Sequence, residues 1–214
     1  MHGLAHWVSA ITCAIAFPAA ALAQGPAFDC AKASGEVEKL ICADQALAAL
    51  DRKLDEVYKA ASAKAKGQLL TTLRTEQRGW VKGRNECWKA QKDTPTYLTA
   101  SWTVDTAKAC VEANYKIRTS ELQAVWRLLP PKTVSFACQN NPANELVANF
   151  FDTDPPSARL ERGDRTMTVW QVPAASGGKY EGQNVTFWTK GNEATASWLN
   201  VATGNTDELK CKAQ

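Results

Sequence analysis

Histidine is the residue whose scarcity says most about this chain. Its only two histidines, His2 and His6, lie within a segment that we expect to be removed. The remaining chain would contain none, which excludes a Ser-His-Asp triad, a Cys-His pair and a zinc site with histidine ligands. Much of ordinary hydrolase chemistry is thereby excluded, and we predict no catalytic residue, no metal site and no cofactor.

Charged side chains are absent from the first 23 residues. An apolar stretch begins at Trp7 and ends in Ala21-Leu22-Ala23, the small-residue pattern of a signal-peptidase site. It is too short for a stable span of about 20 residues, and Pro18 interrupts it, so we expect no retained membrane anchor. The sequence therefore predicts a signal peptide over 1–23, cleavage before Gln24, and a soluble periplasmic or secreted protein.

C-x-x-C pairs are also missing, which argues against a cysteine-ligated metal site. Six of the seven cysteines follow the predicted signal peptide. In an exported chain these six imply disulfides, although six cysteines allow fifteen pairings in principle.

The composition changes at Pro130-Pro131. Before this pair the chain is rich in Ala, Leu, Lys and Arg, and after it in Thr, Asn, Gly and alternating aromatic residues. Such a shift at a stiff proline pair indicates a domain boundary. We predict an α+β protein in two domains, with a helical domain over 27–129 and a β domain over 132–214.

Helical periodicity fills the first domain. Asp44 suits an N-cap, and apolar residues follow it at helical spacing until Gly67. Similar patterns cover about 69–89 and about 104–125, so three helices should form a small antiparallel bundle. We expect two aromatic residues in its core and one arginine in a salt bridge or cap: Trp80, Tyr115 and Arg84.

The charge of the helical domain is mildly positive, with 17 basic and 13 acidic side chains. Nucleic-acid binding would require a strong basic excess on one face together with a recognisable motif, and neither is evident. We therefore interpret the basic residues as a solvated helix face and predict no nucleic-acid partner.

After Pro131 the period of the apolar pattern changes to two residues. Short alternating runs are separated by turn signals such as Asn141-Pro142 and Arg162-Gly163-Asp164. Seven or eight short strands without intervening helices favour a small closed barrel, which leaves no exposed sheet edge.

One stretch of the β domain combines two glycine-rich turns with an alternating run. Ser176-Gly177-Gly178 brings a hydroxyl to a loop tip, and the run over 185–190 ends at Lys190 beside Gly191. Phe187 and Trp188 fall on opposite faces of this strand, so one should fill the barrel and the other lie outside. The pattern predicts two polar tips next to each other.

This stretch is similar to the MliC/PliC family, the periplasmic and membrane-bound inhibitors of c-type lysozyme. The resemblance rests on Ser176-Gly177-x-x-Tyr180, on Phe187-Trp188-x-Lys190-Gly191-x-x-Ala194, and on the spacing of the serine and the lysine. It implies an eight-stranded antiparallel β-barrel whose serine and lysine enter the active-site cleft of the lysozyme. The chain departs from the family pattern at Phe136, usually a tyrosine, and at Ala174-Ala175, usually richer in glycine and serine.

The resemblance implies a lysozyme-binding surface around the two tips. We expect Tyr180 to brace the serine loop rather than to touch the partner, and Lys179 to be a solvated lysine that is available as a rim contact. The residues assigned to this surface are Ser176, Lys190, Tyr180, Gly177, Lys179 and Thr189.

The helical domain resembles the N-terminal domain of LprI-like lysozyme inhibitors. The match covers about residues 27–128, and it runs through Phe28-Asp29-Cys30, Glu38, Leu50-Asp51, Tyr58, Gln77-Arg78-x-Trp80, Arg84-x-x-Cys87 and Cys110-x-x-x-x-Tyr115. Spacing and resemblance together favour three disulfides: Cys30 with Cys42, Cys87 with Cys110, and Cys138 with Cys211.

These observations give a leading hypothesis and two alternatives. The leading one is a secreted, non-enzymatic inhibitor whose partner is a c-type lysozyme. One alternative is an enzyme in which Lys179 or Lys190 activates Ser176 as a nucleophile. The other is a cell-envelope binding or scaffold protein whose helical domain recruits another partner. No oligomeric state is predicted.

Overall fold

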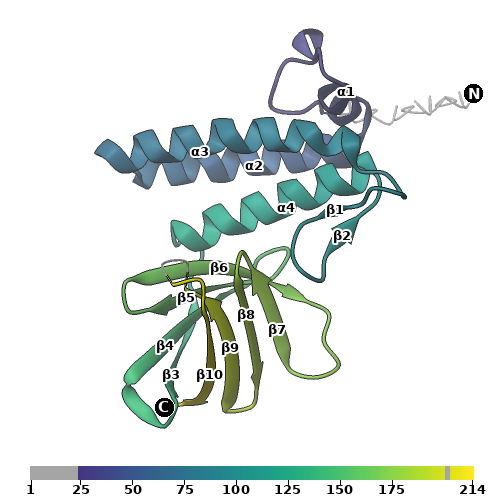
Figure 1. The fold of residues 1–214 in the computed structure, drawn as a ribbon. Helices are drawn as coiled ribbons and strands as arrows, with labels where there is room; N and C mark the ends of the chain where they lie inside the picture. The colour runs from purple at the N-terminus through teal and green to yellow at the C-terminus, as the bar shows by residue number, and fades with distance from the viewer. Residues whose placement is uncertain (1–23, 201–202) are drawn as a thin grey trace, which may run out of the picture.

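The computed structural model describes residues 24–200 and 203–214, so the predicted signal peptide over 1–23 lies outside the described residues. Within the described part, a helical half is followed by a closed barrel of eight antiparallel strands (Figure 1). The predicted α+β fold, with a small helical bundle and an eight-stranded barrel, is confirmed. None of the described helices has the length and apolar character needed to cross a membrane.

Four α-helices make up most of the described helical half: α1 (Glu36–Ala43), α2 (Gln45–Lys64), α3 (Gly67–Asn85) and α4 (Ala107–Val125). Two short 3-10 helices, η1 (Cys30–Lys32) and η2 (Glu86–Lys89), and a hairpin of β1 (Thr96–Tyr97) with β2 (Thr103–Val104) complete it. Figure 1 shows α4 between the α2–α3 pair and the barrel.

Asp44 begins α2 as the sequence predicts. Its Oδ1 accepts hydrogen bonds from the backbone N–H groups of Ala46 at 2.9 Å and Leu47 at 3.1 Å. The side chain thus satisfies two of the donors that a helix start leaves without an intrahelical partner.

Two expectations about the helices are wrong. The sequence did not predict α1, because its eight residues are too few to show a clear helical period. The last helix begins at Ala107 and not near Val104, because the Thr106 hydroxyl accepts from Ala109 N–H at 3.2 Å and caps it. Val104 instead pairs with Thr96 in the β1–β2 hairpin.

Tyr115 lies at the centre of a polar cluster inside the bundle. Its buried hydroxyl donates to Asp51 Oδ1 at 2.7 Å and accepts from Arg84 Nη1 at 2.6 Å. Arg84 is only 4% exposed, and its Nη1 lies 3.9 Å from Asp51 Oδ1. Trp80 packs edge-on against the Tyr115 ring at 5.4 Å. The predicted core role of Tyr115 and the predicted salt bridge of Arg84 are confirmed, whereas Trp80 is only half-buried and packs against the core.

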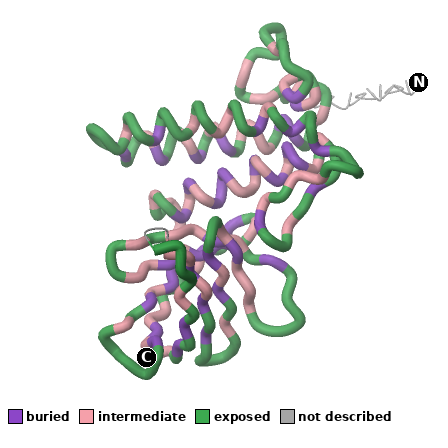
Figure 2. Tube along the Cα trace, viewed as in Figure 1, coloured by how far each residue is buried: buried purple, intermediate pink, exposed green. Residues whose placement is uncertain are grey.

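The barrel contains β3 (Lys132–Cys138), β4 (Asn141–Phe151), β5 (Ser157–Arg162), β6 (Arg165–Val172), β7 (Gly178–Gly182), β8 (Val185–Lys190), β9 (Glu193–Leu199) and β10 (Thr206–Ala213). Each strand pairs with its sequence neighbours, and β10 returns to β3 to close the sheet. Figure 2 shows buried residues on the inside of the barrel and on the facing sides of the helices, and exposed residues in the loops.

All three predicted disulfides are present: Cys30–Cys42, Cys87–Cys110 and Cys138–Cys211. The third lies in the seam that closes the barrel, where β3 and β10 are in register over only three residue pairs. A covalent link at such a short seam stabilises the closed state, and the chain-entropy account attributes roughly 4 kcal/mol to a loop of this size.

The two halves contact each other through polar side chains as well as through packing of α4 on β5 and β6. The Trp170 indole N–H on β6 donates to the Ser120 hydroxyl on α4 at 2.8 Å. The Glu181 carboxylate on β7 accepts from the Thr99 hydroxyl at 2.9 Å, and from Ser101 N–H at 2.8 Å and its hydroxyl at 2.6 Å. The 99–101 loop of the helical half thereby covers the outer face of β7.

Glu181 is 1% exposed although it lies on the outside of the barrel. Burial alone would raise the pKa of its carboxyl group. The Lys179 ammonium at 2.7 Å and the Ser101 and Thr99 donors outweigh that effect and lower the pKa to about 2. The contact between the halves therefore holds an ionised carboxylate at neutral pH.

Glu181→Gln should reduce the free energy of unfolding most strongly above about pH 5. A pKa lowered from 4.5 to about 2 corresponds to roughly 3 kcal/mol, which is fully present above the unfolded pKa and lost as pH falls towards 2. Urea unfolding of the disulfide-intact protein across this pH range measures it. Glu208→Gln on the exposed side of β10 is the control, and a pH-independent deficit in Glu181→Gln would contradict the assignment.

Candidate functional site

The register of β7 against β8 brings the two predicted tips together. Gly178 pairs with Thr189 at the end of this ladder. Ser176 and Gly177 lie directly beyond it on one strand, and Lys190 follows on the other. Glu181, which contacts the helical half, sits at the opposite end of β7. The tips therefore project from the end of the barrel that faces away from the 99–101 loop.

Lys190 is carried by a two-residue turn. It pairs with Glu193, and Gly191, with φ +60°, occupies the first central position, as in a type II′ hairpin turn. The Thr189 hydroxyl donates to the Glu193 carbonyl at 3.2 Å, which ties the two strands just before the turn. A short, internally bonded turn holds the base of the exposed Lys190 side chain in place.

Gly177 sits where the serine loop crosses β8. Its φ is +70°, and an added Cβ would overlap the Thr189 carbonyl oxygen and lie 3.1 Å from Lys190 Cβ. Glycine is the residue that meets both demands, since it tolerates positive φ and allows the close approach. This contact sets the backbone of the serine loop directly against the base of Lys190.

Trp188 holds the serine loop from the outside of the barrel. Its indole N–H donates to the Ser176 carbonyl oxygen at 2.8 Å, while 39% of the residue stays exposed. Phe187 is fully buried inside the barrel, so the expectation that these two rings face opposite sides is confirmed. The hydrogen bond leaves the Ser176 hydroxyl as the exposed polar group of the loop.

Tyr180 supports the same loop from the inside. Its ring lies 5.5 Å from Phe150 and 6.3 Å from Phe187, and burial raises the pKa of its hydroxyl. The ring also contacts the position where Gly178 would carry a Cβ. These contacts pack Tyr180 inside the barrel beside Gly178, the first residue of β7.

Lys179 is not the solvated lysine that we expected by default. Its ammonium is paired with the buried Glu181 carboxylate at 2.7 Å, and only 37% of the side chain is exposed. The ion pair draws the charge towards the helical half and away from the tip. A lysine general base must be neutral, so this pairing also argues against Lys179 as an activator of Ser176.

A cavity of about 520 Å³ adjoins the serine loop. Its lining combines the loop with the outer faces of three strands: Ala174, Ala175, Ser176, Lys179, Thr186, Trp188 and Thr195. In the described part of the chain, no group of three or more His, Cys, Asp or Glu side chains is arranged to hold a metal ion. The polar groups available at this tip are the Ser176 hydroxyl and the Lys190 ammonium, each carried by a backbone segment that is held in place.

Comparison with known proteins matches each half of the chain to a different protein family. Residues 136–204 match the family described as membrane-bound lysozyme-inhibitor of c-type lysozyme, MliC, and residues 30–122 match the family described as lysozyme inhibitor LprI. Both resemblances are confirmed. The barrel is MliC-like and the helical half is LprI-like.

Two curated relatives are the lipoproteins LprI of Mycobacterium tuberculosis and Mycobacterium bovis. Each is 28% identical over 169 residues, which cover 77% of this chain and 75% of the relative. A similar solved structure is that of Pseudomonas aeruginosa MliC in complex with hen egg white lysozyme. The MliC chain is 27% identical to this chain. The match covers 39% of this chain and 82% of the MliC chain, with a TM-score of 0.32.

The sequence did not predict the contacts of two residues, Trp188 beside the serine loop and Glu181 at the other end of β7. Trp188 was assigned only to one face of a strand, and nothing local shows that its indole bonds a carbonyl twelve residues earlier. Glu181 reads as an ordinary strand carboxylate, because its partners lie 80 and 82 residues away. Glu181 shares the outer face of β7 with Lys179, where charged residues are ordinary, so the sequence offers no local signal for its burial.

Gly177→Ala should destabilise the barrel more than Gly163→Ala. Both glycines have positive φ, +70° and +59°, but only Gly177 has no room for a Cβ. Alanine in this conformation costs about 1–2 kcal/mol, and overpacking adds roughly another 1–3 kcal/mol at Gly177. Chemical denaturation of both variants measures the difference. Equal losses would show that the loop does not press against β8.

Proposed function

We propose that this protein inhibits c-type lysozyme by inserting the Ser176 loop and Lys190 into the active-site cleft. The observation that carries the proposal is the β7–β8 register, which presents an exposed hydroxyl and an exposed ammonium at one tip. Both matched families are described as lysozyme inhibitors, which supports the same conclusion.

The chemistry of the target explains why these two groups suit it. Lysozyme works with two carboxyl groups, one kept protonated as an acid and the other ionised. The Lys190 ammonium offers three donors and a positive charge to the ionised group, and the Ser176 hydroxyl can donate to one group and accept from the other. Occupying both excludes the sugar, so the protein acts as a plug rather than as an enzyme.

Rigidity of the tip favours tight binding. The serine loop is fixed by the Trp188 hydrogen bond and by the Gly177 contact, and the lysine sits on a two-residue turn. A preformed tip loses little conformational entropy on insertion, which leaves more of the contact energy for affinity. In this role Tyr180 braces the tip, Thr189 fixes the turn, and Lys179 acts through Glu181 rather than on the lysozyme.

Net charge contributes little to this recognition. Lysozyme is basic, the helical half is mildly basic, and the barrel half carries 8 basic and 9 acidic side chains. Long-range attraction is therefore weak, and short-range insertion must supply the affinity.

The proposed setting is the cell envelope or the medium. Three disulfides suit an oxidising compartment, and one matched family is described as membrane-bound while the curated relatives are called lipoproteins. For this chain we propose export by the segment over 1–23 and release by cleavage before Gln24.

Lys190→Ala and Ser176→Ala should each weaken inhibition of cell-wall clearing by at least about tenfold. Truncating one partner of a buried charged or polar pair typically costs roughly 2–5 kcal/mol, because the remaining lysozyme group is left unpaired. The inhibition constant is measured by titrating the mature protein into a c-type lysozyme assay. Lys132→Ala, an exposed lysine at the start of β3, is the matched control.

Unfolding midpoints of the three variants must equal that of the wild type. Undiminished inhibition by both tip variants would move the activity to another surface of the molecule. Failure of the wild type to inhibit any c-type lysozyme would remove the proposed function altogether.

A further inference from the structure

The LprI-like half contains a long groove that the insertion mechanism does not use. Two adjoining cavities, of about 430 and 500 Å³, lie along α2 and α3 and share the residues Tyr58, Gln77 and Val81. We call them together the α2–α3 groove. Because α4 separates this helix pair from the barrel (Figure 1), the groove is remote from the lysozyme-binding tip.

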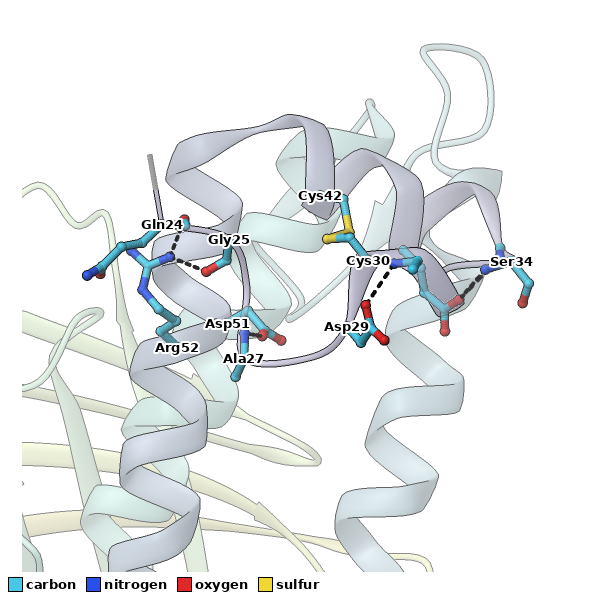
Figure 3. Close-up of a disulfide and its surroundings, with 12 residues drawn as sticks. Gln24, Gly25, Ala27, Asp29, Cys30, Ser34, Cys42, Asp51 and Arg52 are labelled. Atoms are coloured by element: carbon cyan, nitrogen blue, oxygen red, sulfur yellow. Dashed lines mark hydrogen bonds between the residues drawn. A yellow bond between two sulfur atoms is a disulfide. The ribbon is translucent and has the colours of Figure 1, made fainter. Parts of the chain in front are cut away.

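One end of the groove is closed by the N-terminal segment, which is firmly attached. Ala27 N–H donates to Asp51 Oδ2 at 2.7 Å, and Arg52 Nη1 donates to the carbonyl oxygens of Gln24 and Gly25 at 2.7 and 2.6 Å. Figure 3 shows these contacts beside the disulfide that ties η1 to α1. The wall of the groove is therefore preformed.

The first cavity presents aromatic rings, and its charged groups are already satisfied. Phe28, Tyr58 and Trp80 are half-buried in its lining. Arg84 and Asp51 are paired with each other and with Tyr115, as described above. Two further carboxylates, those of Glu38 and Asp55, also have partners within the protein. Glu38 accepts from Ser34 and Gly35 N–H, and Asp55 pairs with Lys59 at 2.6 Å.

Asp29 and Lys32 also line the cavity; they lie 4.0 Å apart, and Asp29 accepts from Ala31 N–H at 3.0 Å. The groups left for a ligand are therefore mainly apolar ring faces and a few uncharged polar groups. Gln77 Oε1 accepts from Arg118 Nε at 3.0 Å, which leaves its amide N–H₂ as the group free for a ligand. In the described residues the Tyr58 hydroxyl and this amide nitrogen have no hydrogen-bond partner in the protein. Stacking faces combined with neutral donors and acceptors suit a pyranose ring, which has an apolar face and a rim of hydroxyls.

The second cavity has the opposite character. Arg74, Arg78 and Lys82 line it and follow one another at four-residue steps along α3. Arg78 Nη2 donates to the Thr75 hydroxyl at 3.0 Å, and none of the three cations belongs to an ion pair among residues 24–200 and 203–214. Unpaired cations next to a neutral ring site suit a carboxylate on the neighbouring sugar.

We propose that the α2–α3 groove binds an acidic oligosaccharide. A pyranose ring lies on Phe28, Tyr58 and Trp80, and its carboxylate substituent or that of the next sugar faces Arg74, Arg78 and Lys82. This site goes beyond lysozyme inhibition and does not depend on it. It would let one end of the molecule hold a carboxylate-bearing glycan while the other end faces the protein partner.

The test uses the mature protein without lysozyme and two disaccharide probes. One is neutral N,N′-diacetylchitobiose, and the other is N-acetylglucosaminyl-N-acetylmuramic acid, which adds a carboxylate to the same kind of scaffold. Calorimetric or NMR titration should show saturable binding of both, with the acidic sugar bound about fivefold more tightly at low salt. That preference should shrink at high salt, because the pairs are exposed.

Variants separate the two parts of the groove. The triple variant Arg74→Ala/Arg78→Ala/Lys82→Ala should remove the preference for the acidic sugar and leave the neutral affinity unchanged. Tyr58→Ala should weaken both sugars by about fivefold or more, with Tyr58→Phe as a milder change that keeps the ring packing. Lys53→Ala, an exposed lysine of α2 outside the groove, should change neither affinity.

The outcomes decide the proposal without reference to lysozyme. Absence of saturable binding of either sugar at about 20 mM would overturn it, and so would equal affinity for the neutral and acidic probes. An acidic preference that survives the triple variant without Arg74, Arg78 and Lys82 would also overturn it. Loss of lysozyme inhibition alone would leave this site untouched, so the two proposals fail separately.

Discussion

Closure of the barrel between β3 and β10 is the constraint on which the rest of the molecule depends. In a closed sheet every strand is paired on both sides, so the register of one ladder fixes that of the next. A slip of one residue between β7 and β8 would exchange Phe187 and Trp188 between the inside and the outside. The tip would then lose both the ring that fills the barrel and the indole that holds the serine loop. The disulfide across the seam protects this arrangement at a ladder of only three residue pairs.

Much of this architecture follows from local patterns in the sequence. The change of apolar period at Pro130-Pro131, the Asp44 cap and the alternation of Phe187 with Trp188 each rest on a few neighbouring residues, and the structure agrees with them. Family resemblance agreed with the closed barrel that the strand pattern favours, and together with spacing it predicted the disulfide pairs. The pairing of the Ser176 loop with Lys190 follows once the hairpin is given, because antiparallel register leaves no other placement.

What the sequence could not predict has a common physical cause. The Glu181 contacts and the α2–α3 groove arise where segments distant in the chain meet. Polar contacts of this kind leave no periodic pattern, since a single carboxylate or indole looks the same whether its partner is water or a loop 80 residues away. The sequence did not predict helix α1 for a different reason, because a short helix is defined by its caps more than by its period.

The order of the cysteines has a consequence for biogenesis. The six cysteines in the described chain pair in sequence order, first with second, third with fourth and fifth with sixth, and no disulfide crosses from the helical half to the barrel. A chain that emerges into an oxidising compartment from its N-terminus would therefore form every native pair simply by joining each unpaired thiol to the one that appears after it. Such a protein needs little disulfide reshuffling, and its helical half can be completed before the barrel has left the translocation channel.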